Sequence, residues 1–329
     1  MVAAEGRAIF LRTMDMEDRT MKTEISKPKT LIITAWVTLL LGGGPFASLP
    51  IIILQEIFDY QVSDNLQYGI AAVVVVVGLG LTFAWNAVRS LRPFFILLLV
   101  LVGAGWLVYA RIGVLPIYER WLAIPSPNVN VGILALVSRP LMVALAIIAA
   151  LFILKKKRDA FFLVKGDTSA PLEPVRWLGI KAGATWNKAG RVSAIVLSLG
   201  TLTFLILAGR PPLDIVVRAL PFLPVILLAS AVNAFSEEMF AKASFLSVLE
   251  DVVGKHQALW LMAYAFGIGH FYGIPYGVIG VLMAGFLGWW LGKSMLETRG
   301  LWWAWFIHFV QDVWIFAFAV VGSIVPGGG

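Results

Sequence analysis

The chain has 329 residues, of which 60% are hydrophobic and only 14% are charged, and its mean hydropathy is +0.87. These values exclude an ordinary water-soluble domain and indicate an integral membrane protein, while the lack of cysteine excludes disulfides, thiolate metal sites and a cysteine nucleophile. The net charge of +7 is explained by basic segments that lie against anionic lipid, so we expect membrane lipid and no nucleic acid as a partner.

Residues 1–30 are polar and lack the apolar centre and cleavage site of a secretory signal, so we expect a cytoplasmic extension. Apolar stretches long enough to cross a bilayer follow, and no alternating barrel pattern is present. The sequence therefore predicts an all-α, polytopic membrane bundle of about eight helices, with a shorter apolar stretch near 257–271. The predicted spans are 31–55, 68–88, 93–110, 131–154, 192–209, 215–236, 276–292 and 301–325.

Basic residues orient the predicted bundle. Arg89 and Arg92 follow the second span, and the linker 155–191 carries many lysines and arginines. By the positive-inside rule these segments and the N-terminus face the cytoplasm, which in a prokaryote implies the plasma membrane. The linker divides the bundle 31–329 into N-terminal helices, 31–154, and a second group of helices, 192–325.

Ionisable residues at membrane depth gather in the second group. Such residues cost a few kcal/mol and usually face an interior cavity or a partner, so they are candidate site residues. They are Glu237, Glu238, Lys242, His270, His308 and Asp312.

Spacing predicts that these residues meet. Glu237 lies 17 residues before Gly254 and His270 lies 16 residues after it, so a turn at Gly254 would bring both to one level, roughly 25 Å from the turn. His308 and Asp312 are four apart and share a helix face. Small residues also recur at every fourth position, which favours close helix packing and a polar intramembrane cavity. They are Ala284, Gly288 and Gly292.

Each feature has a simpler alternative. The acidic pair could face headgroups at a helix end, Lys242 could be an ion-pair partner or reach the interface, and each histidine could be a packing residue. Together, however, the group supplies a base to activate water and side chains to hold an oxyanion, as hydrolysis requires. The same group could also ligate zinc. The candidate ligands are Glu237, His270, His308 and Asp312.

Three ordered motifs resemble the CAAX protease and bacteriocin-processing (CPBP, or Abi) family of intramembrane proteases. The family signatures are EExxxR, FxxxH and HxxxN/D. Here they correspond to Glu237-Glu238 with Lys242, to Phe266-x-x-x-His270 and to His308-x-x-x-Asp312. The likeness covers roughly 220–315, about a third of the chain.

The resemblance implies an endopeptidase with a cavity near the cytoplasmic side and a peptide or protein substrate, which in some members is a prenylated CAAX end. Glu237 would be the general base and His270 would position the attacking water. His308 and Asp312 would stabilise the oxyanion, and Glu238 would be a supporting residue. The resemblance leaves open whether zinc takes part or the mechanism uses glutamate without a metal.

The first and third motifs depart from the family pattern. Lys242 stands where the family has arginine, so a bidentate contact to a carboxylate becomes a single-point contact. Ala241 stands where phenylalanine is usual, with Phe240 one place earlier. Asp312 replaces the asparagine of the prenyl endopeptidase, and an ionised aspartate would repel an oxyanion unless it is protonated, orients His308 or binds a metal.

Two alternatives to a protease follow from the same residues. The changes at Lys242 and Ala241 are also compatible with a non-proteolytic member that binds or regulates a membrane partner or gives immunity to a bacteriocin. Buried ionisable groups also occur in transporters and proton relays. The sequence does not show the inverted repeat or paired broken helices typical of a transporter.

Overall fold

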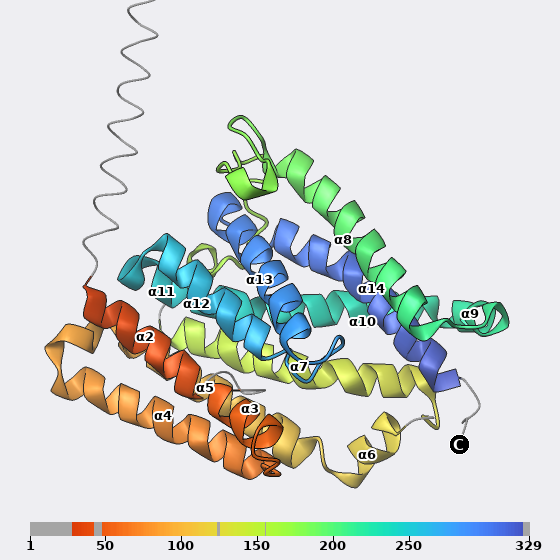
Figure 1. Ribbon diagram of the computed structural model, residues 1–329, viewed down its shortest axis with the longest axis horizontal. Coiled ribbons are helices and arrows are strands. Elements are labelled where there is room, and N and C mark those ends of the chain that lie inside the picture. The colour runs from red at the N-terminus through yellow and green to blue at the C-terminus, as the bar shows by residue number, and fades with distance from the viewer. Residues whose placement is uncertain (1–27, 43–47, 124–125, 155, 325–329) are drawn as a thin grey trace, which may run out of the picture.

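The computed structural model describes residues 28–42, 48–123, 126–154 and 156–324. Most of the predicted extension 1–30 lies outside these residues, as does Lys155 at the start of the predicted linker. Within the described residues, seven helical runs are long and apolar enough to cross a membrane. The predicted all-α, polytopic membrane bundle is therefore confirmed, with seven such runs where about eight were expected (Figure 1).

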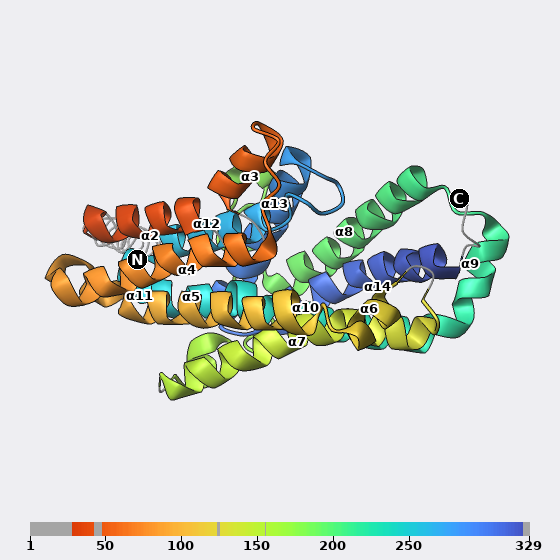
Figure 2. The same ribbon diagram turned by 90° about the horizontal axis from the view of Figure 1, so that it is seen from below.

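The N-terminal helices surround one side of the bundle, where α2 and α4 pack together and α5 packs against α4 and α7 (Figures 1 and 2). Short side-chain caps begin two of them: the Ser63 hydroxyl accepts from Leu66 N and the Asn128 amide oxygen accepts from Val131 N. The elements are α2 (Lys29–Gly42), α3 (Leu49–Glu56), α4 (Asp64–Ala84), η1 (Asn86–Leu91), α5 (Arg92–Gly105), η2 (Trp106–Ile112), α6 (Pro116–Leu122) and α7 (Val129–Ile153).

The prediction of a continuous first span over 31–55 is wrong. α2 ends at Gly42 and α3 begins at Leu49, so neither helix has the roughly 20 residues that a span requires. Ser48, directly before α3, has extended backbone angles of φ −139° and ψ 156°, and Pro50 is favoured in the first turn of a helix, so α3 starts as a new helix.

The C-terminal helices carry the predicted site. α10 packs between α7 and α14, and α8 lies along α14 (Figure 1). The elements are α8 (Trp186–Gly209), α9 (Leu213–Ala219), η5 (Leu220–Phe222), α10 (Leu223–Glu237), η6 (Glu238–Ala243), α11 (Ser244–Val253), α12 (Lys255–Ile268), α13 (Val278–Thr298) and α14 (Trp302–Ile324).

The predicted turn at Gly254 is confirmed. This glycine has φ +90°, a conformation that L side chains rarely adopt, and it separates α11 from α12. The two helices pack against each other, so the chain forms the expected hairpin. A second break at 269–277 then directs the chain into α13.

Small residues allow α12 and α13 to pack closely, as predicted. A Cβ atom added at Gly288 would lie 2.9 Å from Phe266 Cδ1, and one added at Gly292 would lie 2.1 Å from Met262 Cε. Because Phe266 lies less than one helical turn before the break at 269–277, this close packing also fixes the end of α12 that leads to His270.

The linker contains two short helical turns, η3 (Asp159–Phe161) and η4 (Arg176–Leu178), and it is tied to the C-terminal helices. Leu301 N donates to Val164 O over 2.8 Å, and Gly166 approaches Gly300 so closely that a Cβ on Gly166 would lie 2.7 Å from the Gly300 backbone.

An ion-pair cluster closes the same junction. Lys255 Nζ lies 2.5 Å from Glu173 Oε1 and 3.8 Å from Glu297 Oε1. Lys293 forms an ion pair with Glu297, whose second carboxylate oxygen accepts a 2.7 Å hydrogen bond from Trp186 Nε1. We call these five residues the linker clasp.

Candidate active site

A widened helical turn places the two adjacent glutamates in different environments. The last residue of α10 is Glu237, and the next residues form η6, a π-helical segment of the kind often found at functional sites. Consecutive helical residues point about 100° apart. The Glu237 side chain consequently remains 21% exposed, whereas that of Glu238 is fully buried.

Glu238 is the centre of a buried hydrogen-bonded group. Its Oε1 atom accepts from Lys242 Nζ at 2.7 Å and lies 2.7 Å from His308 Nδ1, so the imidazole donates its Nδ1–H to this oxygen. Lys242 has no exposed side-chain surface. Of the roles left open by the sequence, Lys242 therefore has that of a buried ion-pair partner.

Glu237 is held beside this group by Asn233 and faces His308. Asn233 Nδ2 donates to Glu237 Oε1 at 3.1 Å and to Asp312 Oδ2 at 3.0 Å. His308 Nε2 lies 3.7 Å from Glu237 Oε2 and 3.6 Å from Asp312 Oδ1. At the level of Glu237, α10 and α14 are thereby linked by the hydrogen bond from Asn233 to Asp312.

The second motif is linked to the first through Phe266. Lys242 Nζ lies 3.5 Å from the centre of the Phe266 ring, a distance typical of a cation–π contact. His270 also packs against Phe266, with ring centres 4.5 Å apart, and its Nδ1 atom lies 2.7 Å from Phe266 O. Because a carbonyl oxygen can only accept, Nδ1 carries the proton and Nε2 of a neutral His270 is an acceptor.

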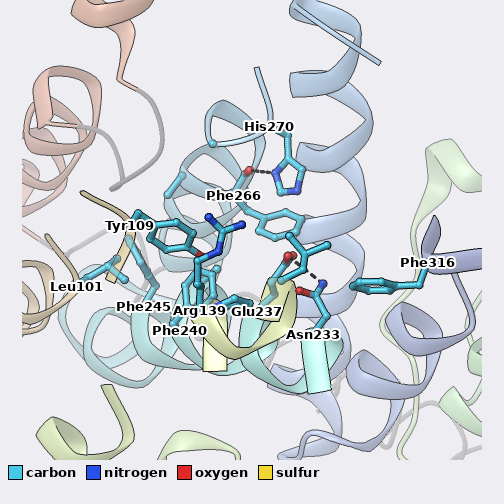
Figure 3. Close-up of a pocket in the computed structure, with 15 residues that line it drawn as sticks. Leu101, Tyr109, Arg139, Asn233, Glu237, Phe240, Phe245, Phe266, His270 and Phe316 are labelled. Carbon is cyan, nitrogen blue, oxygen red and sulfur yellow. Dashed lines mark hydrogen bonds between the residues drawn. The ribbon is translucent and has the colours of Figure 1, made fainter. Parts of the chain in front are cut away.

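Glu237 and His270 line a common cavity of about 320 Å³ (Figure 3). Its walls are mainly apolar and include Phe240 and Ala241, where the phenylalanine of the first motif is shifted by one place. The full lining comprises Leu101, Tyr109, Leu136, Arg139, Pro140, Asn233, Glu237, Phe240, Ala241, Phe245, Ala265, Phe266, Gly269, His270 and Phe316. The cavity thus combines a carboxylate and an imidazole with a largely apolar surface.

The structure brings all the predicted site residues together, but in two layers. Glu237, His270 and Phe266 line the cavity, and Glu238, Lys242, His308 and Asp312 are buried behind Glu237. Sequence reasoning missed Asn233, although it lies four residues before Glu237, where a helix places side chains on one face.

It also missed Arg139, which enters the cavity from α7 (Figure 3). The signal was an arginine in the middle of an apolar span, the same criterion that selected the histidines. Arg139 was overlooked because the search was confined to the second group of helices, whereas the cavity also uses η2 and α7.

The predicted zinc ligands do not form a recognisable metal-binding group. Among the described residues, no three His, Cys, Asp or Glu side chains are arranged to hold a metal ion. His308 Nδ1 and His270 Nδ1 are both engaged in hydrogen bonds, to Glu238 and to Phe266 O.

Residues 219–314 match the family model described as Type II CAAX prenyl endopeptidase Rce1-like. This segment is similar to an Rce1-like domain, and we refer to it below as the Rce1-like domain. It contains every residue predicted from the three motifs, and the family resemblance inferred from them is confirmed over this segment. No curated protein and no solved structure gives a significant match to the chain.

The Rce1-like domain supports a membrane endopeptidase of the CAAX-protease type at the level of the family. The matched segment runs from α9 into α14 and so includes Asn233, Glu237 and His270. Two polar lining residues of the cavity, Tyr109 and Arg139, lie outside it. The cavity is therefore completed by the N-terminal helices.

Proposed function

We propose that the protein is an intramembrane endopeptidase in which Glu237 activates water to hydrolyse a peptide bond near the cytoplasmic side. The proposal rests mainly on the observation that the Glu237 side chain is accessible from the cavity. Among the three clustered carboxylates, its side chain is 21% exposed, against 0% for Glu238 and 4% for Asp312. A general base must reach its water, and only the first of these three meets that condition.

The surrounding hydrogen bonds suit Glu237 for this task. Asn233 donates to one carboxylate oxygen of Glu237, Oε1. The other oxygen, Oε2, lies 3.7 Å from His308 Nε2, which is too far for a hydrogen bond. A water in the cavity can then donate one proton to Glu237 and the other to His270 Nε2, because His270 Nδ1–H is directed to Phe266 O. This arrangement is the basis for assigning water positioning to His270.

In the proposed reaction, the oxygen of the attacking water forms a bond to the scissile carbonyl carbon as Glu237 takes its proton. Collapse of the tetrahedral intermediate breaks the C–N bond, and the proton held by Glu237 passes to the leaving amine. Both protons of the consumed water are then accounted for: one is on the amine, and the other leaves the new carboxylic acid.

In the proposal, His308 keeps its predicted role of stabilising the oxyanion, and Asp312, whose carboxylate would itself repel an oxyanion, contributes by orienting His308. For His308 to act in this way, Nε2 must carry a proton in addition to the one on Nδ1, and the oxyanion must form on the inner side of Glu237, where His308 Nε2 lies. Asp312 accepts from Asn233, which supports a positioning role for its carboxylate. Glu238 and Lys242 would then fix the imidazole from behind.

The proposed substrate is a peptide or protein with a CAAX-type C-terminal segment, which the family match favours. A cavity of about 320 Å³ is at the small end of ligand pockets, so it fits a short extended segment. A prenyl chain attached to that segment would remain in the surrounding lipid.

The test is cleavage of a quenched fluorescent peptide that carries a farnesylated CAAX end, with purified protein in detergent. We expect cleavage by the wild type and its loss in Glu237→Ala, with an unchanged melting temperature. Chelator treatment and zinc addition would show whether a metal is required. Cleavage by Glu237→Ala at the wild-type rate would contradict the proposed base. Absence of cleavage by both the wild type and the variant would favour the non-proteolytic alternative or a different peptide.

A further inference from the structure

Arg139 places a cation in the cavity, and the proposed reaction gives that cation no role. It lies in the middle of α7, an apolar span, where an arginine is costly unless it has a partner or a function. Its guanidinium carbon lies 5.2 Å from the centre of the Tyr109 ring. Figure 3 shows Arg139 reaching between Tyr109 and Phe266 into the space that Glu237 and His270 also face.

Within the described part of the chain, no carboxylate forms an ion pair with Arg139, and its buried Nε atom has no hydrogen-bond partner. Lys242 cannot supply the positive charge in its place, because its side chain is fully buried against Glu238. A ligand in the cavity that carries a negative charge would therefore meet Arg139.

The shape and surroundings of this cation restrict the ligand. A guanidinium can donate two parallel hydrogen bonds to the two oxygens of a carboxylate. The neighbouring walls are apolar and include Leu101, Leu136 and Phe245. A group that suits both features is an apolar residue with a free carboxylate, which is the chemistry of a peptide C-terminus.

We propose that Arg139 binds the C-terminal carboxylate of the substrate and so fixes the distance from the chain end to the cleaved bond. This inference rests on the proposed peptidase function, since it assigns one end of the peptide to Arg139 and the scissile bond to Glu237. The small cavity limits the segment between them to a few residues. Arg139 is a specificity-determining residue in this scheme and takes no proton.

Equilibrium binding tests the proposal independently of turnover. The protein carries Glu237→Gln so that the peptide stays intact, and two farnesylated peptides differ only in ending with a carboxylate or a carboxamide. We expect the carboxylate form to bind roughly 10- to 100-fold more tightly, as for a charge-assisted hydrogen-bonded pair. Adding Arg139→Gln should bring this ratio close to one without weakening the carboxamide peptide.

Two further variants control for charge and for folding. Arg139→Lys keeps the charge and should retain part of the ratio, whereas Arg120→Gln removes an exposed arginine on α6 and should retain all of it. A third peptide, with a carboxamide end and a glutamate as its last residue, distinguishes a side-chain carboxylate from the chain end and should bind like the carboxamide peptide.

The proposal is overturned if the ratio is near one before Arg139 is changed, or if it persists in Arg139→Gln. Equal weakening of both peptides by Arg139→Gln would also overturn it, by showing a structural role. Tight binding of the glutamate peptide would assign Arg139 to a side-chain carboxylate. Absence of cleavage by the wild type contradicts the peptidase function alone, because the binding ratio still decides the role of Arg139.

Discussion

Two lysine–glutamate pairs at i,i+4 spacing lie in the C-terminal helices, and they have opposite surroundings. Glu238 and Lys242 belong to the site, and Lys293 and Glu297 belong to the linker clasp. In the clasp, two carboxylates face two lysines, and Trp186 donates to Glu297. The charges are balanced and the acceptors are used, so the clasp can hold the linker but leaves no base for chemistry.

The site cluster has an excess of acceptors. Glu237, Glu238 and Asp312 face one lysine and one histidine, and the buried Glu238 Oε2 has no hydrogen-bond partner among the described residues. The cluster also borders a cavity, so Glu237 can exchange protons with a ligand there. A lysine–glutamate pair therefore does not by itself mark a candidate catalytic site, whereas an unbalanced set of acceptors beside a cavity does.

Replacing one glutamate in each region should give the largest effects, on catalytic activity at the site and on stability at the linker clasp. Glu237→Gln removes the base without changing shape, so we expect kcat/KM to fall roughly 10²- to 10⁴-fold while the melting temperature stays within about 2 °C. Glu297→Gln leaves two lysines facing one half-exposed glutamate, so it should lower stability and retain kcat. Peptide cleavage and thermal unfolding in detergent measure both properties.

The opposite pattern would contradict the comparison. If Glu297→Gln abolished cleavage in protein that remained folded, the clasp would have a part in catalysis. If Glu237→Gln mainly lowered the melting temperature, Glu237 would be a structural residue like Glu297.

Replacing the lysine of each pair should give a smaller but still large effect, on stability. Lys242→Met leaves the fully buried Glu238 without its lysine and with only the hydrogen bond from His308 Nδ1, which costs up to about 3–5 kcal/mol in the free energy of unfolding. Lys293→Met should cost less, because Lys255 still lies 3.8 Å from Glu297 Oε1 and Trp186 still donates to the other oxygen. Equal losses in the two variants would show that the site cluster is no more dependent on its lysine than the clasp.

Lys242→Arg, which restores the family pattern, provides the matched control. It keeps the charge, and its stability should lie well above that of Lys242→Met. Detergent or denaturant titration of both variants and of the double variant Glu238→Gln/Lys242→Met measures the interaction energy of the pair. The double variant should lose less stability than the sum of the losses in the single variants.

Much of the fold was predictable because membrane spans are encoded locally. An apolar run of about 20 residues defines a helix wherever it occurs, and seven of the predicted spans correspond to helical runs. The first span failed because its length included Gly42 and Pro50, which permit two shorter helices. Hydropathy alone does not register that break.

The site was partly predictable for a different reason. Glu237, His270 and His308 were brought together by spacing around turns, and the structure confirms that they cluster. The division of Glu237 and Glu238 between cavity and interior was not predictable, because it depends on what packs against each side of one helix. Arg139 comes from a helix about 100 residues earlier, and no local pattern specifies that contact.

The ion pair between Glu173 and Lys255, the most exposed pair of the clasp, should have the smallest effect on stability, and this effect should depend on pH. Burial raises the pKa of Glu173, but its hydrogen bond and ion pair with Lys255 outweigh this and hold the pKa below the usual 4.5. A depressed folded-state pKa stabilises the protein above the unfolded value, and this stabilisation is lost as pH falls through the folded value. The Glu173 side chain is 52% exposed, so screening limits the contribution to below about 1 kcal/mol.

Glu173→Gln should therefore lower the melting temperature slightly at pH 7, and the difference from the wild type should vanish as pH falls below 4.5. High salt should shrink the same difference at pH 7, because an exposed pair is screened. Thermal unfolding across this pH range, with Glu119→Gln on α6 as an exposed control, measures the effect. A difference that grew toward acid pH would mean that the carboxylate of Glu173 opposes the docking of the linker, and the clasp would then depend on Lys293, Glu297 and Trp186 alone.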